Sequence, residues 1–445
     1  STDAIREELW GDEFYQGPWE EIEEILHARL KKFVAEDQPV LIDATHAMRA
    51  WRLAITQGIK FNKPVEWIGW WIKTPKNVCL KWNQQRDRTI EEEVIHQYSA
   101  ALAHKDFSPN RSEGFTSFIY FDPSMGKNTK TRLEEEINRL PKRISAARNK
   151  EKSKELHGYS RLIDLERLLF LIQLLTLYPG LSATDQKTNN ELKQICNPLP
   201  EGSMSDRASL FIRAKYGECY ANKDELEKDL QWLDSQGFKE GNLIQESIKP
   251  PLYTEDSNEN MGGWPPLADK AVFVRVMTLL RYILQNPFDG KKDKGTSLFN
   301  HYINKLDNVY MPGEANTLRE DINKLLTPYG FRRSNDNVRH GYGLGTAVLS
   351  AQRLKDIAHF LNESVNKLGD PTAHILQEEL NERLEWAGIE TKNEPLVRVF
   401  ANRSIINTEL LREDSLAYTK KTKTKTKLIA NSDKLEDAIT NNQRI

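Results

Sequence analysis

Two stretches of the chain share one pattern of apolar and polar positions. Residues 224–238 read DELEKDLQWLDSQGF, and residues 316–331 read NTLREDINKLLTPYGF. Apolar residues spaced at i, i+4 and i+7 predict an amphipathic helix in each stretch. A Gly-Phe pair follows each one, and Gly237 and Gly330 predict left-handed C-terminal caps. The matching positions are Leu226, Asp229, Leu230 and Leu233 in the first stretch, and Leu318, Asp321, Ile322 and Leu325 in the second.

Further helical patterns precede both stretches, which indicates a repeated unit of three helices. Residues 161–178 and 269–286 predict the first helix of each unit, and residues 188–196 and 297–306 predict an intermediate helix. The second unit is followed by RRSNDNVRHGYGLG, residues 332–345, a basic and glycine-rich segment. Three helices and a basic hairpin are the outline of a winged helix, which places its third helix in the major groove of DNA.

This outline predicts which side chains would contact nucleic acid. Outward residues of a third helix reach base edges, and arginines of a wing reach phosphates. The candidates are Lys223 and Lys228 in the first unit, Thr317, Arg319, Asn323 and Lys324 in the second, and Arg332, Arg333 and Arg339 in the wing. The alternative is that one or both units are packing or dimerisation modules.

The N-terminal residues have the pattern of an α/β domain. Val40–Ile42, residues 65–73 and residues 113–122 predict three strands, with helical sequence between the second and third. Strands that alternate with helices favour a parallel sheet, with a nucleotide site at the carboxyl ends of its strands. Asp43 directly follows the first predicted strand, where a P-loop fold holds Mg²⁺ or a phosphate acceptor.

Charge divides the 445 residues, whose formal net charge is -2. Residues 1–125 carry 15 Lys and Arg against 20 Asp and Glu, whereas residues 126–157 carry 10 against 5. We predict a domain boundary in that basic segment and a second one in the polar segment 250–266. The tail has five lysines in residues 420–427, typical of a solvated linker or of a segment attracted to phosphates.

Composition excludes some classes of protein. No stretch approaches the roughly 18 uninterrupted apolar residues of a membrane-spanning helix, and the first residues lack the pattern of a secretory signal. Cys79, Cys196 and Cys219 form no CxxC and predict neither a zinc site nor a disulfide framework. We therefore expect a cytoplasmic protein that binds no structural metal and has no membrane partner.

Several N-terminal motifs occur in the order of a known family. STDAIREELWG, VLIDATHA, WNQQRDR and EGF resemble the polynucleotide-kinase-like branch of P-loop kinases, across nearly all of residues 1–122. The resemblance implies roles for five residues. Asp3 would be the general base for the acceptor hydroxyl, Arg6 would grip the acceptor phosphate, Asp43 would lie at the metal and acceptor edge, and Arg86 and Arg88 would be lid arginines that bind the nucleotide.

The phosphate-binding motif GxxxxGK[ST] of that family is absent from the 445 residues. Its backbone amides and lysine cradle the nucleotide phosphates, so we expect no phosphoryl transfer by the chain as it is written. ATP and Mg²⁺ are expected only where a longer chain supplies this loop, whose strand would lie in the middle of the sheet. A fragment of a longer protein and a relic domain both remain open.

The second repeated unit resembles a different family. NTLREDINKLLTPYGF with GYGLG is similar to the winged-helix module of WYL-type transcriptional regulators, and the match covers roughly residues 268–388. The closing KLEDAITNNQRI resembles the start of a ligand-sensing WYL domain. This resemblance implies DNA as a partner and a homodimer.

The predicted fold is an α/β N-terminal domain with an incomplete parallel P-loop sheet, followed by mainly α tandem winged-helix domains and a helical connector. The boundaries are 1–125 for the kinase-like domain, 126–158 for a basic linker, 159–249 for the first winged helix, 250–266 for a linker, 267–348 for the second winged helix, 349–390 for the connector and 391–445 for the tail.

Three classes of function follow. The favoured one is a DNA-binding regulatory protein with a kinase-like nucleotide-binding domain. The alternatives are a polynucleotide 5′-hydroxyl kinase that its winged helices deliver to nucleic acid, and a non-catalytic helical scaffold for protein interaction.

Overall fold

In a computed structural model, the chain divides into two compact parts, residues 1–391 and 392–445. The structure describes residues 1–86, 89–126, 128–150, 154–178, 181, 193–195, 202–238, 247–254, 263–285, 298–331, 357–362, 365 and 371–386, all of them in the first of these parts. The predicted wing at 332–345 and the tail at 391–445 lie outside these residues. No helix in the described ranges has both the length and the apolar character to cross a membrane.

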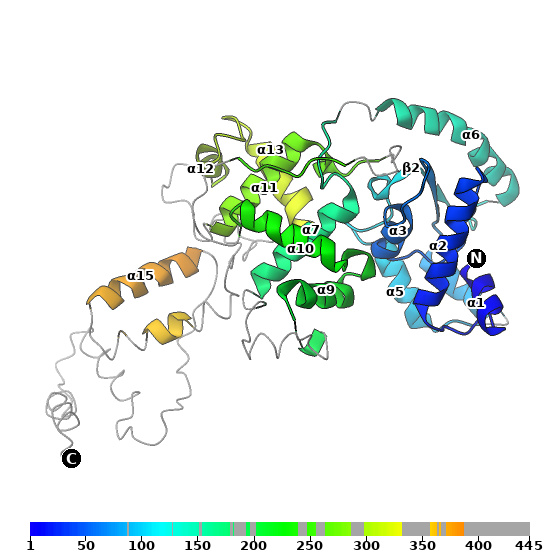
Figure 1. Cartoon of the computed structure of the whole chain (residues 1–445), viewed down its shortest axis with the longest axis horizontal. Helices are drawn as coiled ribbons and strands as arrows, with labels where there is room; N and C mark the ends of the chain where they lie inside the picture. The colour runs from blue at the N-terminus through cyan, green and yellow to red at the C-terminus, as the bar shows by residue number, and fades with distance from the viewer. Residues whose placement is uncertain are drawn as a thin grey trace, which may run out of the picture. The chain divides into compact units, whose positions relative to one another are not determined.

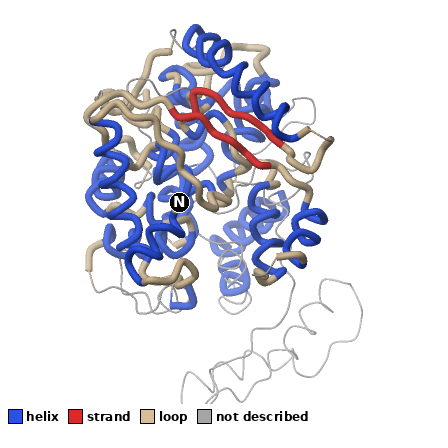
Figure 2. Tube along the Cα trace, turned by 90° about the vertical axis from the view of Figure 1, so that its right-hand side faces the viewer, coloured by secondary structure: helices blue, strands red, loops and turns tan. Residues whose placement is uncertain are grey.

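The N-terminal part contains a small parallel sheet. Strand β1 (Trp67–Ile72) pairs in parallel with β2 (Phe115–Phe121), and the two strands run side by side in Figure 2. The helices α4 (Lys76–Gln84) and α5 (Glu92–Leu102) form the crossover between them. This arrangement confirms the second and third predicted strands and their parallel direction. The strands also explain why residues 65–73 and 113–122 are rich in aromatic and β-branched side chains.

The strand predicted at Val40–Ile42 is wrong, because these residues form a loop. Leu41 is 86% exposed, and no described strand lies beside the segment. A strand needs a neighbour to satisfy its backbone N–H and C=O groups, and here that neighbour is lacking within the described sheet. Apolar, β-branched residues alone therefore do not make a strand at this position.

Three helices pack together beside the sheet. They are α1 (Thr2–Trp10), α2 (Trp19–Ala35) and α3 (Arg49–Thr56). In α2, the buried residues Ile22, Leu26 and Leu30 recur every four positions and face one small core. This spacing places one apolar stripe of α2 against α1 and α3.

The basic segment predicted as a linker forms the helix α6 (Thr129–Lys150), drawn at the top right of Figure 1. Arg132 fixes the start of α6 beside β2, because its Nη2 donates to the carbonyl of Asp122 over 3.1 Å. Pro141 lies inside the helix, where it removes one backbone hydrogen bond.

The described residues between 159 and 331 are mainly helical, as predicted. Its helices are α7 (Leu162–Leu177), α9 (Met204–Lys215), α10 (Lys223–Ser235), α11 (Lys270–Gln285), α12 (Leu298–Lys305) and α13 (Ala315–Glu320). Further along the chain lies α15 (Pro371–Trp386). The predicted helix at 188–196 is described only at residues 193–195. Helix α9 was missed, although Ser203 and Asp206 form the capping box that marks its start.

The third helices of the two units differ in regularity. Helix α10 is a continuous α-helix, whereas α13 passes into a π-helical segment, Asp321–Leu326, and then a 3₁₀ turn, Thr327–Tyr329. The third helix of each unit is followed by the predicted glycine in a left-handed backbone conformation, with φ of 73° at Gly237 and 86° at Gly330. Buried residues of both units belong to one continuous hydrophobic core.

An ion pair between an arginine and a buried aspartate recurs at matching positions of the two units. Arg167 of α7 donates to both carboxylate oxygens of Asp229 in α10, over 2.6 and 3.2 Å. Arg275 of α11 donates in the same way to Asp321, over 2.8 and 3.0 Å. Each aspartate also accepts from a tyrosine hydroxyl, Tyr159 for Asp229 and Tyr310 for Asp321. We call each arrangement an arginine–aspartate clasp.

Candidate functional site

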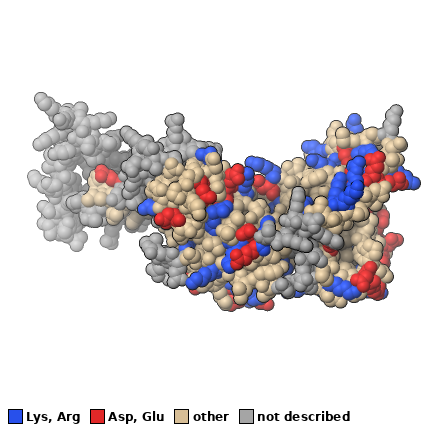
Figure 3. Space-filling model, turned by 90° about the horizontal axis from the view of Figure 1, so that it is seen from above, with Lys and Arg blue, Asp and Glu red and all other residues tan. Residues whose placement is uncertain are grey.

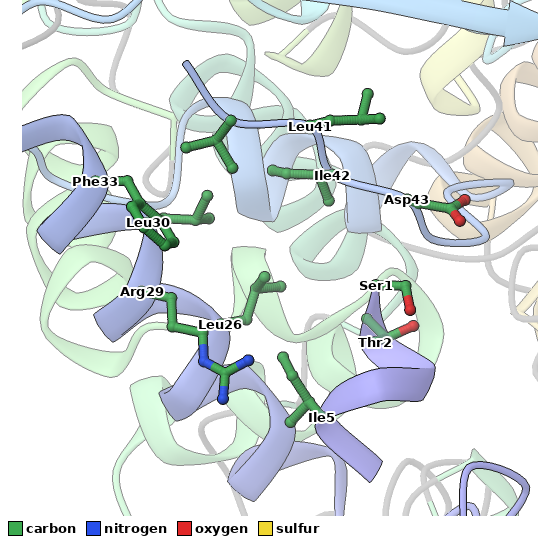
Figure 4. A pocket seen from close by; sticks show the side chains of 11 residues that line it. Ser1, Thr2, Ile5, Leu26, Arg29, Leu30, Phe33, Leu41, Ile42 and Asp43 are labelled. Atoms are coloured by element: carbon green, nitrogen blue, oxygen red, sulfur yellow. The ribbon is translucent and has the colours of Figure 1, made fainter. Parts of the chain in front are cut away.

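A pocket of about 150 Å³ lies between α1, α2 and the loop at residues 40–43. Ser1, Thr2 and Asp43 form its polar end, as Figure 4 shows, and the opposite side is lined mainly by apolar residues such as Leu30 and Phe33. Of the residues that sequence predicted as catalytic, Asp43 is the one that lines this pocket. The structure thus brings Asp43 next to the N-terminus of α1.

Asp3 and Arg6 are one helical turn apart on α1 and bind each other. The Nη1 of Arg6 donates to Oδ1 of Asp3 over 2.6 Å. The Asp3 side chain is 54% exposed, whereas that of Arg6 is 12% exposed. The Nε of Arg6 is buried, and no described residue accepts a hydrogen bond from it. The predicted base and the predicted phosphate-binding arginine therefore form an ion pair on the first turns of α1, and the buried Nε of Arg6 has no acceptor among the described residues.

The predicted lid arginines are only partly described. Arg86 follows the C-terminus of α4 and does not line the pocket, and Arg88 lies outside the described residues. No group of three or more described His, Cys, Asp or Glu side chains could hold a metal ion. Asp43 is the one carboxylate at the pocket, so these residues alone do not fit a Mg²⁺ ion, which needs several oxygen ligands.

The loop that carries Asp43 is fixed by a buried arginine that sequence analysis missed. Nη1 of Arg52 donates to the carbonyls of His46 and Ala47, over 3.0 and 2.7 Å. Nε and Nη2 of Arg52 donate to the carboxylate of Glu113, over 2.6 and 2.9 Å. Glu113 is fully buried, so this pair holds the loop through charge-assisted hydrogen bonds that water does not reach.

A second buried carboxylate, Glu166 of α7, joins the N-terminal part to both helical units. It accepts from Nη1 of Arg49 over 2.7 Å, from the hydroxyl of Tyr220 over 2.5 Å and from the hydroxyl of Tyr329 over 3.0 Å. Arg49 belongs to α3, Tyr220 to the first helical unit and Tyr329 to the end of the second. We call Glu166 and these three donors the Glu166 cluster.

The protonation states of this cluster follow from burial and charge. Burial, and next to it the charge of Glu166, raises the pKa of Tyr220 and of Tyr329 well above the ordinary value, so both hydroxyls keep their protons and donate. Burial alone would lower the pKa of Arg49, but Glu166 and Glu113 more than offset it and raise this pKa. The cluster is therefore a charged pair with neutral donors around it.

The sequence contains a signal for this cluster. Helix α7 is apolar over most of its length, yet Asp164, Glu166 and Arg167 all lie on buried positions. Ionised side chains in an apolar helix require partners, because burying an unpaired charge costs several kcal/mol. What the sequence does not give is which residues those partners are.

The candidate nucleic-acid residues of the third helices lie on the surface, and most have partners. Lys223 pairs with Asp206 and Lys228 with Glu225, over 2.6 and 2.9 Å. The other described candidates are Thr317, which is half-buried, Arg319, which lies over the ring of Phe299 at 4.8 Å, Asn323, which is exposed, and Lys324, which pairs with Glu320 over 3.1 Å. Arg332, Arg333 and Arg339 are outside the described residues.

These pairs make the third helices less basic than the predicted contacts require. On the face drawn in Figure 3, Lys and Arg alternate with Asp and Glu over the described surface. An even mixture of signs attracts a polyanion less than a continuous basic stripe does.

A family model described as "AAA domain" matches residues 1–104. No curated protein and no solved structure matches the chain. The matched range contains α1 to α5, the Asp43 pocket and β1. The match supports a kinase-like, nucleotide-binding domain in the N-terminal part of the chain.

Proposed function

We propose that the N-terminal part is the acceptor-binding part of a phosphotransferase of the polynucleotide-kinase type. The family match over residues 1–104 carries the proposal. The position of Asp43 and the α1 N-terminus at one end of a pocket supports it, since residues of two of the four motifs that resemble the kinase family, STDAIREELWG and VLIDATHA, line that pocket. The ATP phosphates would be held by a GxxxxGK[ST] loop, which these 445 residues do not contain.

The ion pair between Asp3 and Arg6 suggests how the acceptor would enter. An acceptor phosphate would replace the Asp3 carboxylate on the Arg6 guanidinium, which has an unused Nε–H for a second hydrogen bond. The carboxylate of Asp3 would then be free to take the proton of the acceptor hydroxyl, while that oxygen bonds to the γ-phosphorus and ADP leaves.

The role of Asp3 is tested by its conservative substitution. In a chain that includes a phosphate loop, Asp3→Asn is expected to lower the rate of 5′-hydroxyl phosphorylation by about 100-fold or more, because a general base contributes 10²–10⁴-fold. The measurement is transfer of labelled γ-phosphate from ATP to an oligonucleotide with a 5′-hydroxyl end.

The matched control is Asp12→Asn, because Asp12 is an exposed aspartate just after α1. This substitution should leave the rate unchanged. Without the phosphate loop, the 445-residue chain should transfer no phosphate above background. An Asp3→Asn variant as fast as the unmodified chain would refute the role of Asp3.

We propose duplex-DNA binding by the third helices as the second function. The outward position of their cations favours it, since the side chains of Lys228 and Lys324 are 70% and 69% exposed. Both lysines pair with carboxylates on their own helices, which lowers the charge available for phosphates.

This second function predicts a strong dependence on salt. The logarithm of the duplex-binding constant should fall linearly with the logarithm of the salt concentration, and each phosphate contact adds about 0.9 to the slope. Lys228→Ala and Lys324→Ala should each reduce the slope by about 1. The measurement is fluorescence anisotropy of a labelled duplex at several salt concentrations, with Lys63→Ala as control. A slope of zero would exclude this function and favour the helical scaffold.

A further inference from the structure

Helix α6 is long and mostly exposed. Its 22 residues would extend over about 33 Å as a straight helix. Its first turn is joined to the end of β2 by Thr129 and Arg132, which donate to the carbonyls of Pro123 and Asp122. Between residues 133 and 147, Ala147 alone is buried. A helix obtains most of its stability from packing an apolar face against another element, so a long exposed helix is expected to have a partner for such a face.

The large apolar residues of α6 follow the spacing of a coiled coil. They recur at intervals of four, three and four residues, at Leu133, Ile137, Leu140 and Ile144. In a heptad written abcdefg, this spacing places the leucines at d and the isoleucines at a, the positions whose side chains interlock between paired helices. Leu133 is 37% exposed and Ile137 is 48% exposed, and none of the four belongs to a hydrophobic core of the described residues. We call these four residues the α6 seam.

Charge changes sign along the α6 seam. Residues 134–136 are three glutamates, whereas every charged residue from 137 to 150 is Lys or Arg. Glu136 and Arg143 both occupy g positions, which lie beside the seam. Within the chain, Nη2 of Arg143 lies 2.6 Å from Oε2 of Glu136, so the two side chains reach the same flank of the helix. This flank is therefore acidic at one end of the seam and basic at the other.

We propose that α6 pairs with α6 of a second copy of this chain in an antiparallel coiled coil. A twofold axis between residues 138 and 139 would place Ile137 of each copy against Leu140 of the other, and Leu133 against Ile144. The same axis would place Glu136 of each copy beside Arg143 of the other, which gives two ion pairs across the seam. A twofold contact uses the same surface on both copies, so that surface has to be complementary to itself. In the antiparallel orientation, the α6 seam meets this requirement.

A parallel pair of α6 helices lacks this complementarity. It would lay the three glutamates of one chain alongside the same three glutamates of the other, and Glu136 would face Pro141 instead of an arginine. Pro141 occupies an e position, so it takes no apolar residue from the seam in either orientation. A helix of unrelated sequence could cover the seam, yet the match of Glu136 with Arg143 requires a second α6.

Sedimentation equilibrium of the 445-residue chain over about a hundredfold range of concentration tests the pairing, because a dimer gains population with concentration. The average mass is expected to approach twice that of one chain. Ile137→Asn should raise the dissociation constant of the dimer about tenfold or more, since both copies lose a buried aliphatic side chain at once. The control is Ile375→Asn, because Ile375 is 57% exposed on another helix, α15, and should not affect the dimer.

Two charge reversals test the orientation. Glu136→Arg and Arg143→Glu each bring like charges together across the antiparallel seam, so each variant alone should dimerise more weakly than the unmodified chain. In a mixture of the two variants, positions 136 and 143 of opposite copies carry opposite charges on both sides of the axis. The mixed dimer should therefore form in about tenfold preference to either homodimer. Fluorescence energy transfer between a donor-labelled and an acceptor-labelled variant measures this preference.

Pairing through α6 requires neither the Asp43 pocket nor the third helices, so it is independent of both proposed functions. A chain that stays monomeric at every concentration would overturn the pairing and leave the α6 seam to a partner of another kind. A dimer that Ile137→Asn leaves unchanged would do the same, because its interface lies elsewhere. A dimer that Ile137→Asn weakens, but whose charge-reversed variants show no preference for each other, would overturn the antiparallel orientation.

Discussion

Glu166→Ala is expected to lower the free energy of unfolding by about 3–5 kcal/mol, the cost of removing one partner from a buried ion pair. The substitution leaves the guanidinium of Arg49 with one carboxylate, Glu113, instead of two, and leaves the hydroxyls of Tyr220 and Tyr329 without their acceptor. Chemical denaturation followed by circular dichroism measures the change, because helices dominate the signal.

Glu218→Ala is the control, since Glu218 is 63% exposed and pairs with Arg213 on the surface. Exposed ion pairs contribute about 0–1 kcal/mol, so this variant should be nearly as stable as the unmodified protein. If Glu166→Ala does not fold, Tyr329→Phe removes one hydrogen bond at a cost of about 0.5–1.5 kcal/mol and remains measurable. Equal stability of the Glu166 and Glu218 variants would contradict the Glu166 cluster.

Removing the aspartate of each clasp should destabilise the protein to different degrees. Asp229→Ala is expected to cost about 3–5 kcal/mol, because the Arg167 side chain is only 6% exposed and keeps one buried carboxylate, Asp164, of the two to which it donates. Asp321→Ala is expected to cost about 1.5–3 kcal/mol, since Arg275 is 23% exposed and water can replace part of the lost partner. Urea denaturation of both variants gives the comparison.

The reference for this pair is Asp234→Ala, a surface substitution near the end of α10 that should change stability by less than about 0.5 kcal/mol. Replacing both members of the first clasp by apolar residues, as in Arg167→Met with Asp229→Leu, should recover much of the loss from Asp229→Ala. A larger loss from Asp321→Ala than from Asp229→Ala would show that exposure of the arginine does not set the cost.

Periodicity predicted the helices of the repeated units because their apolar residues face one core. The repeated apolar pattern included Leu226 and Leu318, and both are fully buried. The matching of residues 224–238 with residues 316–331 also paired Asp229 with Asp321, and in the structure these are the aspartates of the two arginine–aspartate clasps. Their arginines could not be predicted, because Arg167 precedes Asp229 by 62 residues and Arg275 precedes Asp321 by 46.

The π-helical segment after Glu320 also escaped prediction. Asp321 begins it, held by Arg275 and Tyr310, and Pro328 lies in the 3₁₀ turn that ends it. A side-chain pattern reports which face of a helix is buried, but it does not report a local change of hydrogen-bond register.

At the candidate site, sequence predicted residue types better than it predicted their arrangement. Asp43 lines the pocket, yet the strand that was expected to present it is a loop held by Arg52 and Glu113. A strand depends on the pairing partner beside it, and a single segment contains no information about that partner. The ion pair between Asp3 and Arg6 follows from their spacing of three on a helix, so it was predictable.

The Glu166 cluster has a consequence for how such a protein could evolve. Arg49 comes from the kinase-like part, while its acceptor and the two tyrosines come from helices more than a hundred residues later. Recombination that exchanged either part for a foreign homologue would bring an arginine without its carboxylate, or a carboxylate without its arginine. The two parts are therefore expected to be inherited together, with substitutions at positions 49, 166, 220 and 329 correlated among descendants.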